Sequence, residues 1–217
     1  MKPVMALDID GTLLDYYRHF LRFAADYFGT WDPSEPSYYE YDARVPLHTY
    51  LKVSKVSYRK CKLAYRRGEL KRSLPLLRPP YPQADDLTRT LRRWGCDVWL
   101  CTTRPYLSHD QVDDATRHNL RRNGVVYQGV IWGEHKYREL VRTIGKQRIV
   151  GVLDDLPEMC QQALGLGLRT AFAVRDHNMT QWAELRHGDM VGVPGVSDEQ
   201  DTLTVFRHWL DEWKDAQ

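Results

Sequence analysis

The sequence lacks the features that mark membrane proteins and disulfide-rich secreted proteins. No stretch of its 217 residues approaches the roughly 18 consecutive apolar residues of a membrane span. The N-terminal segment MKPVMALDIDG reaches acidic residues before an apolar region of signal-peptide length can form. The four cysteines are scattered, and no two have the C-x-x-C spacing of zinc or thioredoxin sites. We therefore expect a cytoplasmic protein without a membrane partner, whose thiols are reduced and structural.

The charge balance is close to neutral, and the chain has no internal repeat or low-complexity tract. A net charge of +2 is too small to indicate nucleic-acid binding by the chain as a whole. The hydrophobic fraction of 42% is enough to fill a core, which argues against general disorder. The length suits one domain with room for an insertion.

Short apolar runs alternate with amphipathic stretches over most of the chain. The apolar runs predict strands at residues 4–9, 98–101, 130–131, 148–153 and 169–174. The amphipathic stretches predict helices at residues 84–94, 110–122, 136–144, 157–164 and 203–213. This alternation indicates βαβ units, and hence a Rossmann-like three-layer α/β fold with a parallel sheet between helices.

Polar side chains follow three of the predicted strands at the point where each strand ends. Asp8 and Asp10, separated by one residue, point the same way from an extended chain. Thr102 follows the second strand, and Asp154 and Asp155 follow the fourth. In open parallel sheets the ligand site lies beyond the carboxyl ends of the strands. We expect these residues to meet there, because paired acids are costly to bury unless a cation or substrate uses them.

Residues 16–82 differ in character from the rest of the chain. They are rich in tyrosine, arginine and lysine, include a helical stretch at 48–70, and end in a cluster of prolines. A connection between two neighbouring elements needs far fewer residues. We expect this insert to form a small helical cap after the first strand, over a core made of residues 1–15 and 83–217.

The insert is strongly basic, and two interpretations of this charge stay open. One is a solvated helix whose tyrosines pack inward. The other is a site for anionic or polynucleotide substrates. Glu69 is the lone acid among these basic residues, which are Lys52, Lys55, Arg59, Lys60, Lys62, Arg66, Arg67, Lys71, Arg72 and Arg78.

The order of the motifs resembles the haloacid dehalogenase-like hydrolase superfamily, in its phosphatase branch. The resemblance runs from Val4 to Val174 and includes the D-x-D-G-T segment that begins at Asp8. It implies that Asp8 is a nucleophile that forms an aspartyl-phosphate, and that Asp10 is the general acid and base. It also implies that the hydroxyl of Thr102 binds the phosphoryl oxygens.

The same resemblance implies a catalytic lysine and a Mg²⁺ cofactor. The family has a lysine at the start of the helix before the last catalytic strand, where Lys136 lies. Lys146 is the competitor, but it lies in the turn before that strand, at the far edge of the sheet. The implied metal ligands are Asp8, Asp10 through its carbonyl, Asp154 and, directly or through water, Asp155.

Within the superfamily, the sequence is most similar to the 5'(3')-deoxyribonucleotidases. Shared features are the helical insert after the first motif, the C-T-T run that ends at Thr103, and the pair His177-Asn178. The resemblance implies that Tyr16 lines a nucleobase pocket, where stacking is worth about 1–3 kcal/mol. Thr103 and Arg104 are then candidate substrate contacts. The expected function is magnesium-dependent dephosphorylation of (deoxy)nucleoside monophosphates.

Two other functions remain open. Polynucleotide 3'-phosphatases share the arginine after the second motif, and a basic insert suits their substrates. A catalytically inactive nucleotide-binding module would keep the fold without turnover. The expected partner is in any case a small phosphate monoester, with nucleic acid as the alternative, and the sequence carries no signal for the oligomeric state.

Overall fold

The computed structural model of the protein describes residues 1–29, 41–67, 80–103 and 112–217. These residues form an all-parallel sheet of six strands in the order β3-β2-β1-β4-β5-β6. The strands are β1 (Val4–Asp8), β2 (Asp97–Thr102), β3 (Gly129–Trp132), β4 (Ile149–Asp154), β5 (Thr170–Ala173) and β6 (Gly195–Val196). The predicted Rossmann-like fold class is confirmed.

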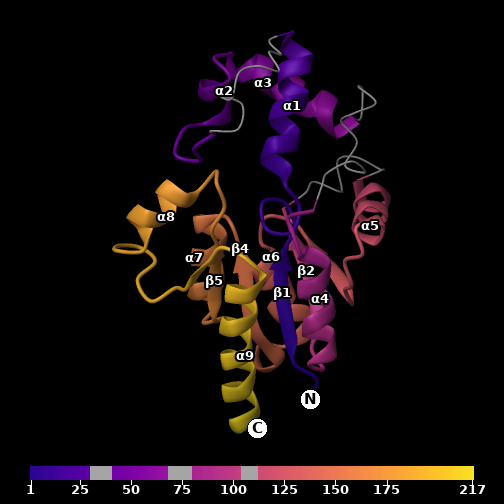
Figure 1. Cartoon of the computed structure of the whole chain (residues 1–217), viewed down its shortest axis with the longest axis vertical. Helices are drawn as coiled ribbons and strands as arrows, with labels where there is room; N and C mark the ends of the chain where they lie inside the picture. Colours follow the sequence, from indigo (N-terminus) through magenta and orange to yellow (C-terminus); the bar gives the residue numbers. More distant parts are fainter. Residues whose placement is uncertain (30–40, 68–79, 104–111) are drawn as a thin grey trace.

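Helices cover both faces of the sheet (Figure 1). α4 (Ala84–Arg93) and α9 (Glu199–Asp215) pack against each other and against β2 and β4 on one face. α6 (Lys136–Ile144) and α7 (Pro157–Gly165) form the layer on the other face. The remaining elements of this part are α5 (Val112–Arg122), the short 3-10 helix η4 (Lys146–Arg148) and α8 (Met179–Leu185).

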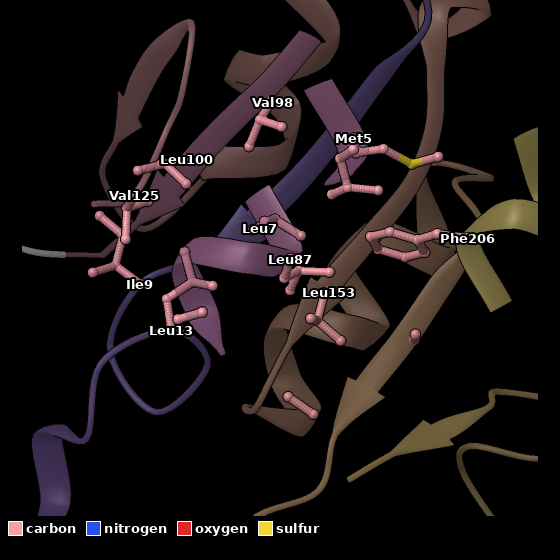
Figure 2. Packing of buried hydrophobic residues seen from close by; sticks show 14 of the residues in the cluster. Met5, Leu7, Ile9, Leu13, Leu87, Val98, Leu100, Val125, Leu153 and Phe206 are labelled. Carbon is pink, nitrogen blue, oxygen red and sulfur yellow. The ribbon is translucent and has the colours of Figure 1, made fainter. Parts of the chain in front are cut away.

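Side chains along β1 alternate between the two faces, as strand geometry requires. Met5 and Leu7 lie in the larger core cluster together with Phe206 of α9 (Figure 2). Ala6 belongs to the cluster under α6. Burial of each large apolar side chain stabilises the fold by about 1.5–3 kcal/mol. Because Asp8 has the same parity as Ala6, its side chain lies on the α6 side of the sheet.

The insert contains three described helices, which lie beyond the carboxyl ends of the strands (Figure 1). They are α1 (Tyr16–Phe28), α2 (Leu47–Tyr50) and α3 (Lys55–Arg67). α1 and α3 share a small core of their own, to which Phe20 and Tyr65 contribute. The two ends of the insert lie side by side, where the backbone N–H of Tyr81 donates to the carbonyl of Leu13 at 2.9 Å.

The prediction of one helix over residues 48–70 is wrong. α2 ends at Tyr50, and α3 begins only at Lys55. Between them Lys52 has a positive φ of 53°, a conformation that a continuing α-helix does not contain. Residues 68–70 lie outside the described part of the chain. The sequence also did not reveal α8 and β6, which are too short to show a clear periodicity.

All four cysteines are buried and free, as the scattered spacing predicted. None of the helices in the described ranges combines the length and the apolar character that a bilayer crossing needs.

Candidate active site

Strand register brings two of the predicted acids together. β1 and β4 are neighbours, with Leu7 opposite Leu153, so Asp8 and Asp154 end these strands side by side. Asp154 has the same parity as Val152, whose side chain lies in the cluster under α6. Both carboxylates are buried, Asp8 at 4% exposure and Asp154 at 0%. The pair therefore needs a positive group close by.

Lys136 supplies a positive charge between these two carboxylates. It is the first residue of α6, is fully buried, and forms ion pairs with Asp8 and with Asp154, the latter at 2.6 Å from Nζ to Oδ2. Its ammonium also donates to the carbonyl of Cys101 at 3.3 Å. The hydroxyl of Tyr137 donates to the same Oδ2 of Asp154. Lys136 and Tyr137, the first two residues of α6, therefore both contact one carboxylate at the N-terminal end of the helix, the end towards which helical side chains tilt.

Asp155, the residue after β4, packs against the loop that follows β1. Gly11 has a φ of +90°, and a Cβ at this position would lie 2.0 Å from Oδ2 of Asp155. Nε2 of His177 lies 3.1 Å from the same oxygen. Nδ2 of Asn178 donates to the backbone carbonyl of Asp155 at 3.1 Å. The carboxylate thus lies between His177 and Gly11, and glycine is required at residue 11 for it to fit.

The three carboxylates form a cluster that fits a divalent cation. One oxygen from each of Asp8, Asp154 and Asp155 lies within 4.8 Å of the others, and all three residues are buried. With the single ammonium of Lys136, the formal charge of the cluster is −2. Carboxylate oxygens are the ligands that Mg²⁺ prefers in proteins. Both the donor atoms and the charge therefore suit Mg²⁺.

The pKa values of the site residues reflect the same excess of negative charge. Burial raises the pKa of Asp8 well above its usual value, although Lys136 acts in the opposite direction. Burial and the neighbouring Asp154 raise the pKa of Asp155 in the same way. Burial acts to lower the pKa of Lys136, but the two carboxylates outweigh it and raise the pKa. The lysine is thus charged, and one ammonium does not compensate three carboxylates.

The other predicted site residues lie at the same edge of the sheet but outside this cluster. Thr102 is the last residue of β2, one residue beyond the level of Asp8, and is 2% exposed. Asp10 is partly exposed, in the loop after β1, and acts to raise the pKa of Asp155. Thr103 is exposed. Arg104 lies outside the described residues.

Tyr16, predicted to contact a nucleobase, is the first residue of α1 and is partly buried. Its ring stacks on Phe20 at 5.7 Å between centroids and meets the edge of Tyr65 at 6.0 Å. Tyr16 therefore joins the start of the insert to the aromatic core between α1 and α3.

The sequence did not identify Tyr137, His177 and Arg175 as site residues. Tyr137 carries no motif, and its pairing with Asp154 depends on where α6 starts. His177 was noted only as part of a family pattern. Arg175 is partly buried, donates to the carbonyl of Thr12 at 3.0 Å, and lies over the ring of Tyr81 at 4.6 Å. These contacts join segments that are distant in sequence, which single-sequence periodicity does not detect.

A cavity of about 680 Å³ lies between α1, the exit of the insert and the loop after β5. Tyr17, Tyr81 and Arg175 line it, and Thr12 and His177 border both the cavity and Asp155. Among the described residues that line it, none belongs to the three-carboxylate cluster. The cavity is therefore next to the acidic cluster but separated from it by side chains.

The basic residues of the insert are largely exposed. Lys52, which precedes α3, and Lys55, Arg59 and Lys60 of α3 have exposed side chains, whereas Cys61 and Tyr65 of α3 are buried against α1. The tyrosine thus packs inward while the charges face solvent. Lys71, Arg72, Arg78 and Glu69 lie outside the described residues.

Comparison with known proteins identifies the fold. Neither the family models nor the curated proteins that were searched gave a match. Solved structures gave many, with low sequence identity. A haloacid dehalogenase-like family hydrolase from Streptococcus pneumoniae matches with a TM-score of 0.65 and 14% identity, over 94% of this chain and 98% of the other.

Two further solved structures bind or act on sugar phosphates. A variant of CbbY from Rhodobacter sphaeroides, in complex with xylulose 1,5-bisphosphate, has a TM-score of 0.56 and 17% identity over 92% of this chain and 95% of its own. D,D-heptose 1,7-bisphosphate phosphatase from Burkholderia thailandensis has a TM-score of 0.57 and 12% identity over 95% and 99%. At these identities the shared property is the fold, and the chain has the α/β fold of haloacid dehalogenase-like hydrolases.

Proposed function

We propose that the protein is a magnesium-dependent phosphomonoester hydrolase that uses Asp8 as its nucleophile. The observation that carries this proposal is the contact of one buried lysine, Lys136, with both Asp8 and Asp154. Asp155 lies within 4.8 Å of these acids and completes a cation site. A structural ion pair would not need the third carboxylate, since an uncompensated buried charge destabilises a fold.

Asp8, Asp154 and Asp155 would hold Mg²⁺, together with the backbone carbonyl of Asp10. When bound, the cation offsets the repulsion between the nucleophile and the phosphate dianion. The chain itself has to keep Asp8 ionised, although burial raises its pKa. Lys136 favours the ionised form because its positive charge lowers the pKa of Asp8.

In the proposed reaction, a carboxylate oxygen of Asp8 forms a bond to phosphorus while the bond from phosphorus to the ester oxygen breaks. Asp10 gives its proton to the leaving oxygen, and its partial exposure suits contact with substrate. The ammonium of Lys136 and the hydroxyl of Thr102 bind the phosphoryl oxygens. Water then cleaves the aspartyl-phosphate, with Asp10 accepting the proton, and phosphate leaves.

We further propose that residues 16–82 act as a cap that selects the substrate. The first choice of substrate is a (deoxy)nucleoside monophosphate, with the base against Tyr16 and with Thr103 and Arg104 near the phosphate. Tyr16 supports this choice because it directly follows the catalytic loop and is only partly buried. A nucleic-acid end is the second candidate, favoured by the exposed basic residues of α3. The structural neighbours add sugar phosphates to the panel to be tested.

Hydrolysis of an aryl phosphate with and without Mg²⁺ tests the chemistry. We expect turnover only with metal, and no measurable turnover by Asp8→Asn or Asp10→Asn, while Asp26→Asn on the exposed side of α1 keeps wild-type activity. Activity that survives in Asp8→Asn contradicts the nucleophile assignment. Binding of Mg²⁺ and phosphate by wild type without any turnover would instead indicate a binding module.

The substrate class is tested with a panel of phosphate esters at equal concentration. A deoxynucleoside monophosphate, a 3'-phosphorylated oligonucleotide and a sugar bisphosphate are compared by kcat/KM. The proposal expects the mononucleotide to rank first. A ranking led by the oligonucleotide or by the sugar phosphate would replace the nucleotidase assignment while leaving the phosphatase chemistry intact.

A further inference from the structure

His177 connects the acidic cluster to the insert. It follows β5, is 7% exposed, and places Nε2 3.1 Å from Oδ2 of Asp155. A carboxylate oxygen in that position accepts, so the proton of the neutral ring sits on Nε2 and is donated to Asp155. Histidines that donate to a carboxylate fix the orientation of both groups.

The opposite side of His177 is held by the insert. The ring of Tyr17, on α1, lies 4.1 Å from the imidazole between centroids, and it stacks in turn on Tyr41 at 5.5 Å. The backbone N–H of Ala43 donates to the carbonyl of His177 at 2.6 Å. Two segments of the insert, the first turn of α1 and the segment around Ala43, therefore contact one residue of the core.

The loop around His177 is itself firmly tied to the sheet. The side chain of Asn178 donates to the carbonyls of Asp155 and Ala173, at 3.1 and 3.0 Å. It accepts from the backbone N–H of Arg175 at 2.7 Å. The backbone of Asp155 is thus fixed by Asn178, whereas His177 acts on its carboxylate, whose other oxygen, Oδ1, lies 3.5 Å from the hydroxyl of Thr12.

We propose that His177 is a positioning residue for the carboxylate of Asp155, and that Tyr17, through its contact with His177, makes the metal affinity depend on the position of the insert. This rests on the proposed function, because the metal is the one that the phosphatase reaction uses. His177 contacts no reacting atom. Its effect is to fix the rotation of the carboxylate of Asp155, one oxygen of which lies within 4.8 Å of oxygens of Asp8 and Asp154.

The test is the affinity of the whole chain, residues 1–217, for Mn²⁺, a spectroscopic substitute for Mg²⁺, measured by electron paramagnetic resonance without substrate. His177→Phe keeps a ring against Tyr17 but loses the donor, and we expect the dissociation constant to rise about 10–100-fold. His177→Gln keeps an N–H donor of similar reach and should stay within about threefold of wild type. This rescue separates positioning from simple packing.

The coupling to the insert is tested by a double-mutant cycle. Tyr17→Leu should weaken Mn²⁺ binding in the wild-type background and have no further effect in His177→Phe, since both act through one hydrogen bond. Tyr27→Leu is the matched control, because Tyr27 lies on the same helix and is 39% exposed. Additive effects of Tyr17→Leu and His177→Phe would overturn the coupling.

Each failure has a separate signature. If wild type binds neither Mn²⁺ nor Mg²⁺, the proposed metal-dependent function is wrong. If wild type binds metal and His177→Phe binds it equally well, the positioning role is wrong and the function stands. Should His177→Phe not fold, as judged by circular dichroism, His177→Asn replaces it, because the shorter side chain does not reach Oδ2 and the same loss is expected.

Discussion

The carboxyl edge of the sheet and the α3 helix of the insert both carry concentrated charge, but the charge is buried at the edge and exposed on α3. At the edge, Lys136 is fully buried between Asp8 and Asp154. On α3, Lys55 and Lys60 are exposed. Buried charges interact strongly and must be matched, whereas exposed charges are screened by water and salt. The buried, matched charge at the edge fits the proposed reaction centre, whereas the exposed charge of α3 fits either a solvated helix or a recognition surface.

This comparison predicts very different effects for the same substitution in the two regions. Lys136→Met should lower kcat about 10²–10³-fold, because it removes a cation that contacts the nucleophile. It should also lower the free energy of unfolding by about 3–5 kcal/mol, because two buried carboxylates lose their partner. Steady-state kinetics and urea denaturation measure both.

Lys60→Met on α3 is the matched control. It changes the same side chain at an exposed position and should alter stability by less than about 0.5 kcal/mol. Equal losses in the two variants would mean that the burial of Lys136 has no energetic consequence, and the contrast between the regions would disappear. Added Mg²⁺ should recover part of the stability of Lys136→Met, since a cation in the cluster replaces the missing charge.

Two glycines sharpen the comparison, because they share a backbone conformation but not an environment. Gly11 and Gly29 have φ values of +90° and +66°. A Cβ at residue 11 would lie 2.0 Å from Oδ2 of Asp155, whereas nothing lies within 4 Å at residue 29. Gly29→Ala should cost about 1 kcal/mol of stability from strain alone. Gly11→Ala should cost more and should weaken metal binding at least about tenfold.

The two glycine variants are compared by thermal denaturation with and without Mg²⁺. The expected pattern is a metal-dependent stabilisation that survives in Gly29→Ala and is lost in Gly11→Ala. If both variants keep it, the carboxylate of Asp155 moves aside at little cost and does not hold the cation.

His177 makes the stability of the protein depend on pH. Burial lowers its pKa from 6.5 to about 4. Above pH 6.5 neither the folded nor the unfolded state carries the proton. Below pH 6.5 the imidazole binds a proton in the unfolded state but not in the folded state. The free energy of unfolding therefore decreases as the pH is lowered towards about 4. The difference of 2.5 units corresponds to about 3 kcal/mol in total.

Urea denaturation of the protein in EDTA, at pH 7 and pH 4.5, measures this loss. We expect His177→Gln to lose about 2–3 kcal/mol less than wild type between the two pH values. A wild-type loss that His177→Gln shares in full would assign the pH dependence to other groups.

The sequence predicted the fold class, because the strands are continuous apolar runs and their alternation with helices indicates a parallel sheet covered on both faces. It also placed Asp8, Asp154 and Asp155 at one edge, since the carboxyl ends of parallel strands must meet there. Lys136 was selected over Lys146 from its place at a helix start, and Lys146 is exposed in η4.

What the sequence did not predict depends on contacts between distant segments. The start of α6 at Lys136 was predicted, but the contact of Tyr137 with Asp154 joins a helix to a neighbouring strand, and helical periodicity does not show which distant carboxylate a side chain reaches. His177 reaches Asp155 across 22 positions of sequence. The break between α2 and α3 depends on the positive φ of Lys52, a residue with no preference for that conformation.

The smallest expected effects separate the two candidate roles of the insert. Lys55→Gln, Arg59→Gln and Lys60→Gln together remove three exposed charges from α3. If α3 is only solvated, kcat/KM should change less than about twofold for every substrate, since surface charges contribute little. If it binds nucleic-acid ends, kcat/KM for a 3'-phosphorylated oligonucleotide should fall and its dependence on salt should weaken. The mononucleotide, with at most two negative charges, should be nearly unaffected in either case.

Tyr16→Ala makes the complementary change, raising KM for the mononucleotide through the loss of about 1–3 kcal/mol of stacking. Opposite responses of the two substrates to these variants would divide recognition between α3 and the start of α1, whereas identical responses would place it elsewhere in the chain.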